Sequence, residues 1–299
     1  MIVGALATLT SAAQPLTVSV MVSVTNRSGT ERVRGLTATD FRVFEDGVEQ
    51  EVASVAEGPG PVSVAVVLDT SDGMAGRRME MAQRSVESLV AGLAPEDEVA
   101  LVTHEHGISV AVPWTDPAKF PKLEWARWKT MLSSEVLQGV YQALGLINEA
   151  KHARTAVILV SNAEQAASKY GLREFVKSRR ESETGIYGLR TADLLSGSVG
   201  IGGPRPGSPH SNLTIWDSRG ALISFDDLVR DSGGLVLPAR TAPEAERSAT
   251  KLVSELRNQY VVTFTSTRLA DNMYRRLKVE LRKTGPKLRH RTGYLAKPQ

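Results

Sequence analysis

The segment Pro61–Met74 (PVSVAVVLDTSDGM) constrains the fold of this chain more than any other. Val62–Leu68 is an almost continuous apolar run with several β-branched residues, and it ends abruptly at the polar segment Asp69–Gly73. An apolar run of this length, bounded by polar turn residues, is typical of a strand that is buried on both faces of a parallel sheet. The polar segment therefore follows the carboxyl end of a central strand, where open α/β sheets place their ligand sites.

Strands and helices alternate from this segment to residue 258. Apolar residues at helical spacing predict a helix over residues 79–93, with further helices at 134–150, 172–176, 225–231 and 243–258. Buried strands are expected at residues 99–103, 156–160, 186–189 and 235–237. A second run at 108–112 follows 99–103 so closely that the two form a hairpin with an antiparallel edge strand. This order predicts an α/β domain over residues 61–258 with a doubly wound, mostly parallel sheet.

Both ends of the chain are rich in strand patterns. Apolar and polar residues alternate in the segments Leu16–Thr25, Tyr260–Thr265 and Leu277–Leu281. Asp46-Gly47, between two further runs, is typical of a two-residue hairpin turn. Because neither end can bury a core alone, we predict that residues 16–58 and 259–296 pair into one small β-sandwich-like module that flanks the α/β domain.

Composition excludes several kinds of site. The 299 residues include no cysteine, so disulfides, thiolate metal sites and cysteine nucleophiles are excluded. The net charge of +3 is too small to indicate nucleic-acid binding.

Residues 1–15 are apolar and too short for a transmembrane anchor. We interpret them as a signal segment with a truncated start, which predicts export; a frayed apolar tail or an extra strand is the alternative.

The order Asp-x-Ser at Asp69 and Ser71 resembles the first motif of a von Willebrand factor type A domain. In that family a D-x-S-x-S loop binds a divalent ion, helped by a Thr and an Asp from two later loops. The segments that resemble one bacterial group of such proteins, abundant in Acidobacteria, are Gly35–Phe41, Phe44–Gly47, Leu256–Tyr260 and Arg291–Tyr294. The resemblance covers about residues 16–296. Because these proteins are mostly exported and of largely unknown activity, it implies a fold and a location.

The metal loop departs from the family pattern. Asp69 and Ser71 match the first two ligand positions, but Gly73 replaces the second serine, Gln138 the threonine and Asn162 the aspartate. Mg²⁺ prefers oxygen ligands, and carboxylates supply most of the attraction. We therefore expect a degenerate metal-ion-dependent adhesion site that is a metal-free relic, with weak Mg²⁺ or Ca²⁺ binding through Asp69 and Ser71 as the alternative.

These replacements have a physical logic. Two crowded carboxylates without a cation repel each other, and an asparagine at position 162 removes that repulsion while it keeps hydrogen-bonding capacity. We expect Asp69, Ser71, Gln138 and Asn162 to hold their loops together without an ion. Asp72 is a further candidate at the same place, since its carboxylate could compensate for the lost ligand.

The remaining candidates are weaker. His104 and His106 share a strand face and could hold a metal, but no third ligand is evident, and a solvated hairpin turn is the simpler interpretation. Ser196–Gly220 is a long Gly-, Pro- and Ser-rich connection. We interpret Trp114, Trp125, Trp128 and Trp216 as core or loop anchors. The carboxyl-terminal basic residues predict a solvated strand face, with polyanion binding as the alternative; they are Arg275, Arg276, Lys278, Arg282, Lys283, Lys287, Arg289 and Arg291.

No hydrolase or nucleotide-binding motif is present, so we expect a noncatalytic protein-interaction or adhesion-like module of the bacterial envelope. We expect a protein partner and no cofactor. The expected ligand-binding surface comprises Asp69, Ser71, Asp72, His104, His106, Gln138 and Asn162. The alternatives are an envelope structural or assembly protein that binds through its β module, and a hydrolase that uses the polar cluster.

Overall fold

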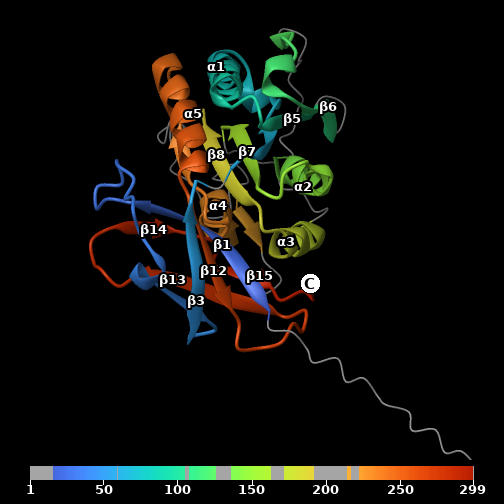
Figure 1. The fold of residues 1–299 in the computed structure, drawn as a ribbon. Coiled ribbons are helices and arrows are strands. Elements are labelled where there is room, and N and C mark those ends of the chain that lie inside the picture. The colour runs from blue at the N-terminus through green and yellow to red at the C-terminus, as the bar shows by residue number, and fades with distance from the viewer. Residues whose placement is uncertain are drawn as a thin grey trace, which may run out of the picture.

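A computed structural model describes residues 16–58, 60–104, 108–125, 136–162, 172–191, 214–216 and 222–298. These residues form two large sheets, one covered by helices on both faces and one curled, together with a small two-stranded sheet (Figure 1). The expected signal segment 1–15, His106 and most of Ser196–Gly220 lie outside the described residues. Within the described part of the chain, no helix combines the length and apolar character needed to span a membrane.

The first sheet has six strands in the order β11-β8-β7-β4-β5-β6. Its strands are β4 (Ser63–Leu68), β5 (Glu98–His104), β6 (Ile108–Thr115), β7 (Thr155–Ser161), β8 (Gly185–Arg190) and β11 (Val236–Pro238). All neighbours are parallel except β5 and β6, which form the predicted antiparallel edge hairpin. All six residues of β4 are buried, as predicted for a central strand.

Helices cover both faces of this sheet (Figure 1). On one face, α1 (Arg77–Gly92) and α5 (Ala242–Arg257) enclose a core that includes Val64, Val66 and Leu68. On the other face, α2 (Val136–Leu146), α3 (Leu172–Glu181) and α4 (Phe225–Asp231) enclose a second core that includes Ala65 and Val67. The predicted mostly parallel α/β fold is confirmed.

The second sheet is antiparallel and draws its strands from both chain ends in the order β14-β1-β12-β3-β2-β13-β15. The strands are β1 (Thr17–Thr25), β2 (Phe41–Glu45), β3 (Val48–Glu57), β12 (Tyr260–Thr265), β13 (Tyr274–Leu281), β14 (Lys287–Arg289) and β15 (Gly293–Leu295). Asp46 and Gly47 have φ angles of 48° and 88°, as the predicted hairpin turn requires. The two ends thus form one module, which we call the β module.

Four short strands were not predicted from the sequence. β14 and β15 extend the β module at its two edges, and β9 (Thr214–Trp216) pairs with β10 (Leu222–Ser224). The long connection Ser196–Gly220 therefore contains a short strand, β9. Each of these four strands has only three residues, which is too short for an alternating pattern to be recognisable.

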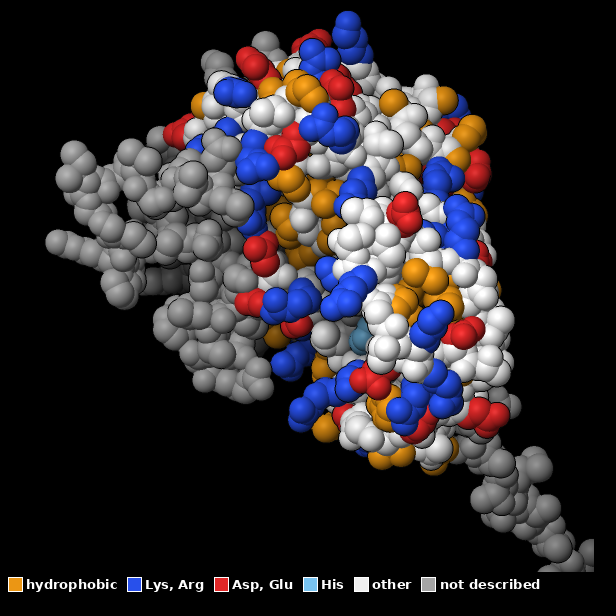
Figure 2. Space-filling view, turned by 90° about the vertical axis from the view of Figure 1, so that its left-hand side faces the viewer, with side chains coloured by type: hydrophobic (Ala, Val, Ile, Leu, Met, Phe, Trp, Pro, Cys, Tyr) orange, Lys and Arg blue, Asp and Glu red, His pale blue; other side chains and the backbone are white. Residues whose placement is uncertain are grey.

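The basic carboxyl-terminal segment is only partly a solvated face. Lys278 and Arg282 are exposed, as predicted, but Arg275 and Arg291 retain only 1% and 7% of their accessible surface. On the face in Figure 2, Lys and Arg side chains are interspersed with Asp and Glu. This mixture agrees with the expectation that the charges mostly solvate the surface.

Candidate functional site

Polar residues meet where β4 and β7 end. Asp69 follows β4, Ser161 is the last residue of β7, and Asn162 comes next. β4 and β7 are parallel neighbours in register through Leu68 and Val160, so their carboxyl ends lie side by side. Asp69, Ser71 and Asn162 are all buried. The structure therefore brings together three of the residues that the sequence assigned to one surface.

The Asp69 carboxylate is held by hydrogen bonds at both oxygens. The backbone N–H of Ser71 donates to Oδ1 at 3.0 Å, and the Ser161 hydroxyl donates to Oδ2 at 2.6 Å. A carboxylate that accepts a hydroxyl proton at this distance makes a strong, charge-assisted bond. Asp69 thus links its own loop to the end of β7. The role of Ser161 was missed from the sequence because the comparison with the family pattern assigned a consequence only to its neighbour Asn162.

Met74 is the second link, and nothing in its sequence context indicated it. It ends a 3₁₀ turn, η2 (Asp72–Met74), and its side chain is completely buried. Its Sδ atom accepts the Asn162 N–H at 3.1 Å and the Thr191 hydroxyl at 3.4 Å. Thr191 follows β8, and its own N–H donates to the Ser161 carbonyl at 3.0 Å. The thioether is a weak acceptor, yet its position joins the loops that follow β4, β7 and β8.

Gln138 and Asp72 are two further candidates from the sequence. Gln138 is half-buried in the first turn of α2. The next residue, Gly139, lies against β4 so closely that an added Cβ would stand 2.8 Å from Cγ1 of Val67. The glycine therefore sets the approach of Gln138 to the carboxyl end of β4. Asp72 is exposed in η2 and faces outward from the buried cluster.

The histidine motif is described only in part. His104 is the last residue of β5 and pairs with Ile108 across the turn, so the predicted hairpin is confirmed. His106 lies outside the described residues, and a metal site at this turn stays a prediction.

The ligand atoms at the Asp69 loop match a divalent ion poorly. Within the described ranges, no group of three or more His, Asp or Glu side chains is arranged to hold a metal. The single buried carboxylate already accepts two hydrogen bonds, and the position of the second family carboxylate is Asn162. Because Mg²⁺ binding depends on carboxylate charge in octahedral geometry, these residues do not fit the ion.

A basic hollow adjoins the cluster. It has a volume of about 320 Å³, and its lining includes Asp72, Arg77, Arg78, Thr191 and Arg240. Arg78 donates to the Gly73 carbonyl at 2.6 Å, which fixes its guanidinium beside the loop. Sequence reasoning missed this feature, although the pair Arg77-Arg78 directly follows the polar loop.

Arg240 is held in the basic hollow by the first turn of α5. Its guanidinium forms a paired contact with the Glu244 carboxylate at 2.6 and 3.0 Å. The hydrogen bond from Arg240 lowers the pKa of Glu244 to about 2. Three positively charged guanidinium groups therefore line the hollow. The nearby negative charges are the exposed carboxylate of Asp72 and the carboxylate of Glu244, which is already paired with Arg240.

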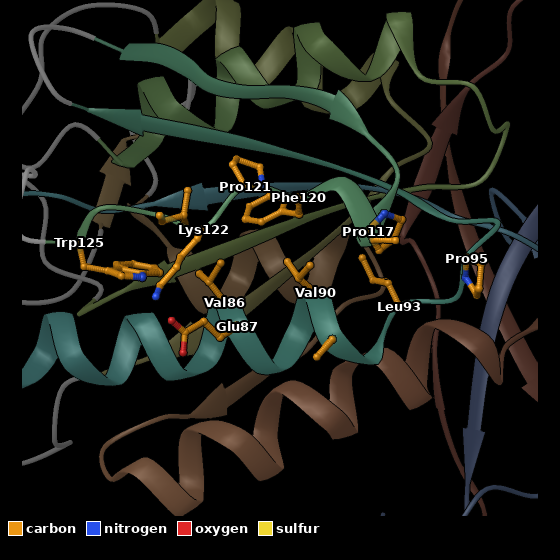
Figure 3. Close-up of a pocket in the computed structure, with 13 residues that line it drawn as sticks. Val86, Glu87, Val90, Leu93, Pro95, Pro117, Phe120, Pro121, Lys122 and Trp125 are labelled. Atoms are coloured by element: carbon orange, nitrogen blue, oxygen red, sulfur yellow. The ribbon is translucent and has the colours of Figure 1, made fainter.

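A separate apolar groove of about 420 Å³ runs along α1 (Figure 3). Val86 and Val90 form its floor, and the segment 117–125 forms the opposite wall with Phe120 and Trp125. Val86 belongs to the core under α1, against which Val90, Phe120 and Trp125 pack. The groove is thus a shallow opening in the packing that attaches this segment to α1.

The tryptophan interpretation is confirmed where the side chains are described. Trp125 packs on the core under α1. Trp114 packs on the second core, and its ring N–H donates to the Leu146 carbonyl at 3.2 Å. Trp128 and the side chain of Trp216 lie outside the described part of the chain.

Comparison with protein families gives a match over part of the chain. Residues 64–165 match the family described as von Willebrand factor type A domain. Over this part of the chain the sequence is therefore similar to a type A domain, in agreement with the resemblance inferred from Asp69 and Ser71. The comparison with curated proteins finds no match.

Solved structures show distant likeness. The von Willebrand factor type A protein from Catenulispora acidiphila is 9% identical with a TM-score of 0.45, over 99% of this chain and 77% of that one. An aerotolerance-related membrane protein from Bacteroides fragilis is 16% identical with a TM-score of 0.42, over 65% of this chain and 99% of that one. The PilB minor pilin from Streptococcus sanguinis is 8% identical with a TM-score of 0.46, over 67% of this chain and 62% of that one. No function is transferred from likeness this distant.

Proposed function

We propose that this von Willebrand factor type A domain is a noncatalytic protein-interaction module whose ligand face is assembled without a metal ion. Type A domains are mostly noncatalytic modules that bind proteins. The observation that carries the proposal is the pair of links at the carboxyl end of the sheet, Asp69 to Ser161 and Met74 to Asn162 and Thr191. These contacts supply the loop-to-loop connection that a shared cation supplies in the metal-dependent members of the family.

The proposed binding face extends outward from these links. Its described members are exposed Asp72, half-buried Gln138 and the basic hollow lined by Arg77, Arg78 and Arg240. Because the hollow carries more positive than negative groups, an acidic surface on the partner is electrostatically favoured. We also propose that His104 and His106 border this face, at the same end of the sheet.

The motif segments support a proposal about where the protein acts and about the bacterial group to which it belongs. The four motif segments resemble bacterial proteins that are mostly exported, and we propose that this chain is an adhesion-like member of the Acidobacteria-type group that acts in the cell envelope. Fractionation of producing cells tests the location: recovery outside the cytoplasm agrees with it, and recovery only in the cytoplasm contradicts it.

Partner capture from envelope extracts tests the function. The bait is the full chain, and the comparison is between wild type, Arg77→Ala with Gln138→Ala, and a control with Lys278→Ala on the exposed β-module face. The proposal predicts a partner that persists in chelator, is lost with the face variant and is kept with the control. Loss in chelator contradicts metal independence. If all three proteins capture the partner equally, the partner does not bind at this face. That result would favour the alternative of an envelope structural or assembly protein that binds through its β module.

A further inference from the structure

Arg154 connects the two places where the chain crosses between the α/β domain and the β module. It directly precedes β7, and its Nη1 donates to the carbonyl of Gly60 in the first crossing at 2.8 Å. Its Nη2 approaches Oε1 of Gln259, in the second crossing, at 3.5 Å. Both acceptors are neutral, so these contacts position the guanidinium without balancing its charge.

Arg154 is buried with no carboxylate partner in the described part of the chain. Only 7% of its surface is exposed, and no described carboxylate oxygen lies within 4.0 Å of it. The Asp97 carboxylate influences it from a distance but is bonded to Arg257. Burial lowers the pKa of Arg154 to about 10, which leaves the guanidinium charged at neutral pH. A buried charge without an opposite charge is costly, and it is commonly neutralised by a partner.

A cavity of about 480 Å³ lies beside Arg154, between the two sheets. Its lining includes Lys151, His152 and Arg154 from the loop before β7, Tyr187 from β8, Gln259 from the second crossing, and Arg291 from the β module. The single acidic lining residue, Glu183, is paired with Arg291 at 2.8 Å. The positive charges of Arg154 and Lys151 are therefore left in excess within the cavity.

The cavity also offers neutral hydrogen-bond donors. Gln259 donates to the Tyr187 hydroxyl at 3.0 Å, which leaves the hydroxyl proton free to donate to a bound acceptor. A volume of this size is within the range of sites for small molecules. Guanidinium groups bind planar carboxylates and phosphates with paired, charge-assisted hydrogen bonds.

We propose that this junction cavity binds a small molecule that carries a carboxylate or phosphate group, and that Arg154 recognises this anionic group. The site is distinct from the ligand face, because the loop before β7 lies at the opposite end of the strand from Asn162. It does not depend on the proposed function. Since its walls come from both domains, a bound anion stabilises their junction.

Thermal melts and calorimetry with inorganic phosphate and with citrate test the site, against sodium chloride at equal ionic strength. We expect one or both anions to raise Tm beyond the chloride control, and which one does so identifies the anionic group. Arg154→Gln, which keeps hydrogen-bond donors but removes the charge, should weaken binding by about tenfold or more. Lys151→Gln, at an exposed position, should weaken it several-fold, and Lys278→Gln on the far β module should leave it unchanged.

Amide hydrogen exchange locates the bound anion. We expect slower exchange at residues 60–63 and 151–155, with no change in the Asp69 loop. If Arg154→Gln does not fold, Lys151→Gln and the exchange pattern still decide the question. The proposal is overturned by a response no larger than that to chloride, by equal binding to Lys151→Gln and wild type, or by protection only outside the junction.

Discussion

Tyr294, near the carboxyl end, donates its hydroxyl to Oε1 of Glu45, in β2, at 2.8 Å. A second hydrogen bond joins Leu36 to Tyr260: the Leu36 N–H donates to the Tyr260 hydroxyl at 3.3 Å. These two contacts connect all four segments that carry the wider family resemblance. The segments therefore close the β module around its own core, and their pattern is explained by structure without a ligand.

A buried ion pair lies at the centre of this closure. Arg275 and Glu45 are both 1% exposed and lie 2.6 Å apart, and Ser266 also donates to Glu45 at 2.7 Å. Removing one partner leaves the other charge buried and unpaired. We expect Arg275→Met to lower the free energy of unfolding by about 3–5 kcal/mol. Denaturant unfolding measures it, with exposed Arg276→Met as the control; equal effects of the two changes contradict the account.

The same ion pair predicts a dependence on pH. Burial raises the pKa of Glu45, but hydrogen bonds from Ser266, Arg275 and Tyr294 outweigh it, so the net pKa is below the ordinary value. A carboxylate whose pKa is lower in the folded than in the unfolded state stabilises the folded state while it is ionised. This contribution is fully present above the pKa of the unfolded state, about 4.3, and it is lost as the pH falls through the pKa of the folded state. We expect the Tm difference between wild type and Glu45→Gln to be larger at pH 7 than at pH 3. A difference independent of pH contradicts this.

Met74→Leu tests the sulfur link between the loops. Leucine keeps a similar apolar volume but leaves the Asn162 N–H and the Thr191 hydroxyl without their shared acceptor. A buried donor without an acceptor costs about 1–3 kcal/mol, and we expect a loss of stability in that range. Met79→Leu, in a partly buried position that packs on the same core, is the control. If both variants unfold at the same denaturant concentration, the thioether contacts contribute nothing.

Gly139→Ala tests the close approach of α2 to β4. The new methyl group would stand 2.8 Å from Val67 and push the helix away, so we expect a loss of about 1–3 kcal/mol. Gly145→Ala in the same helix meets nothing within 4 Å, and the higher helix propensity of alanine should make it neutral or stabilising. Denaturant unfolding should give a lower free energy of unfolding for Gly139→Ala and an equal or higher one for Gly145→Ala. If both variants are more stable than the wild type, the close packing is contradicted.

The fold was largely predictable because its strands carry clear patterns. β4 is apolar throughout, as burial on both faces requires, and β1 and β12 alternate. The same alternation also predicts that two charged residues are buried. Arg275 lies two residues before Leu277 in β13, and Glu45 lies two residues after Val43 in β2, so period 2 places both on the buried faces. We grouped Arg275 with the basic residues of the solvated strand face and did not extend the alternation of Leu277 and Val279 back to it.

The candidate site was less predictable because its links depend on tertiary placement. Asp69 was identifiable from its position after a buried strand. The contact of Met74 with Asn162 and Thr191 was not, because a methionine after a turn has the same pattern as any core residue. Arg154 was also overlooked, since its burial depends on two crossings that are about 200 residues apart in the sequence.

Thermal melting of wild type and Asn162→Asp, each in chelator and in millimolar Mg²⁺, tests the central claim most directly. In the wild type the loops are joined by Asp69, Ser161 and Met74, so we predict the same Tm in both conditions. Asn162→Asp adds a second carboxylate beside Asp69, and we predict a lower Tm in chelator that Mg²⁺ restores. A wild-type Tm that rises with Mg²⁺ and loses this response in Asp69→Ala would show that the loop is a working metal site and contradict the account.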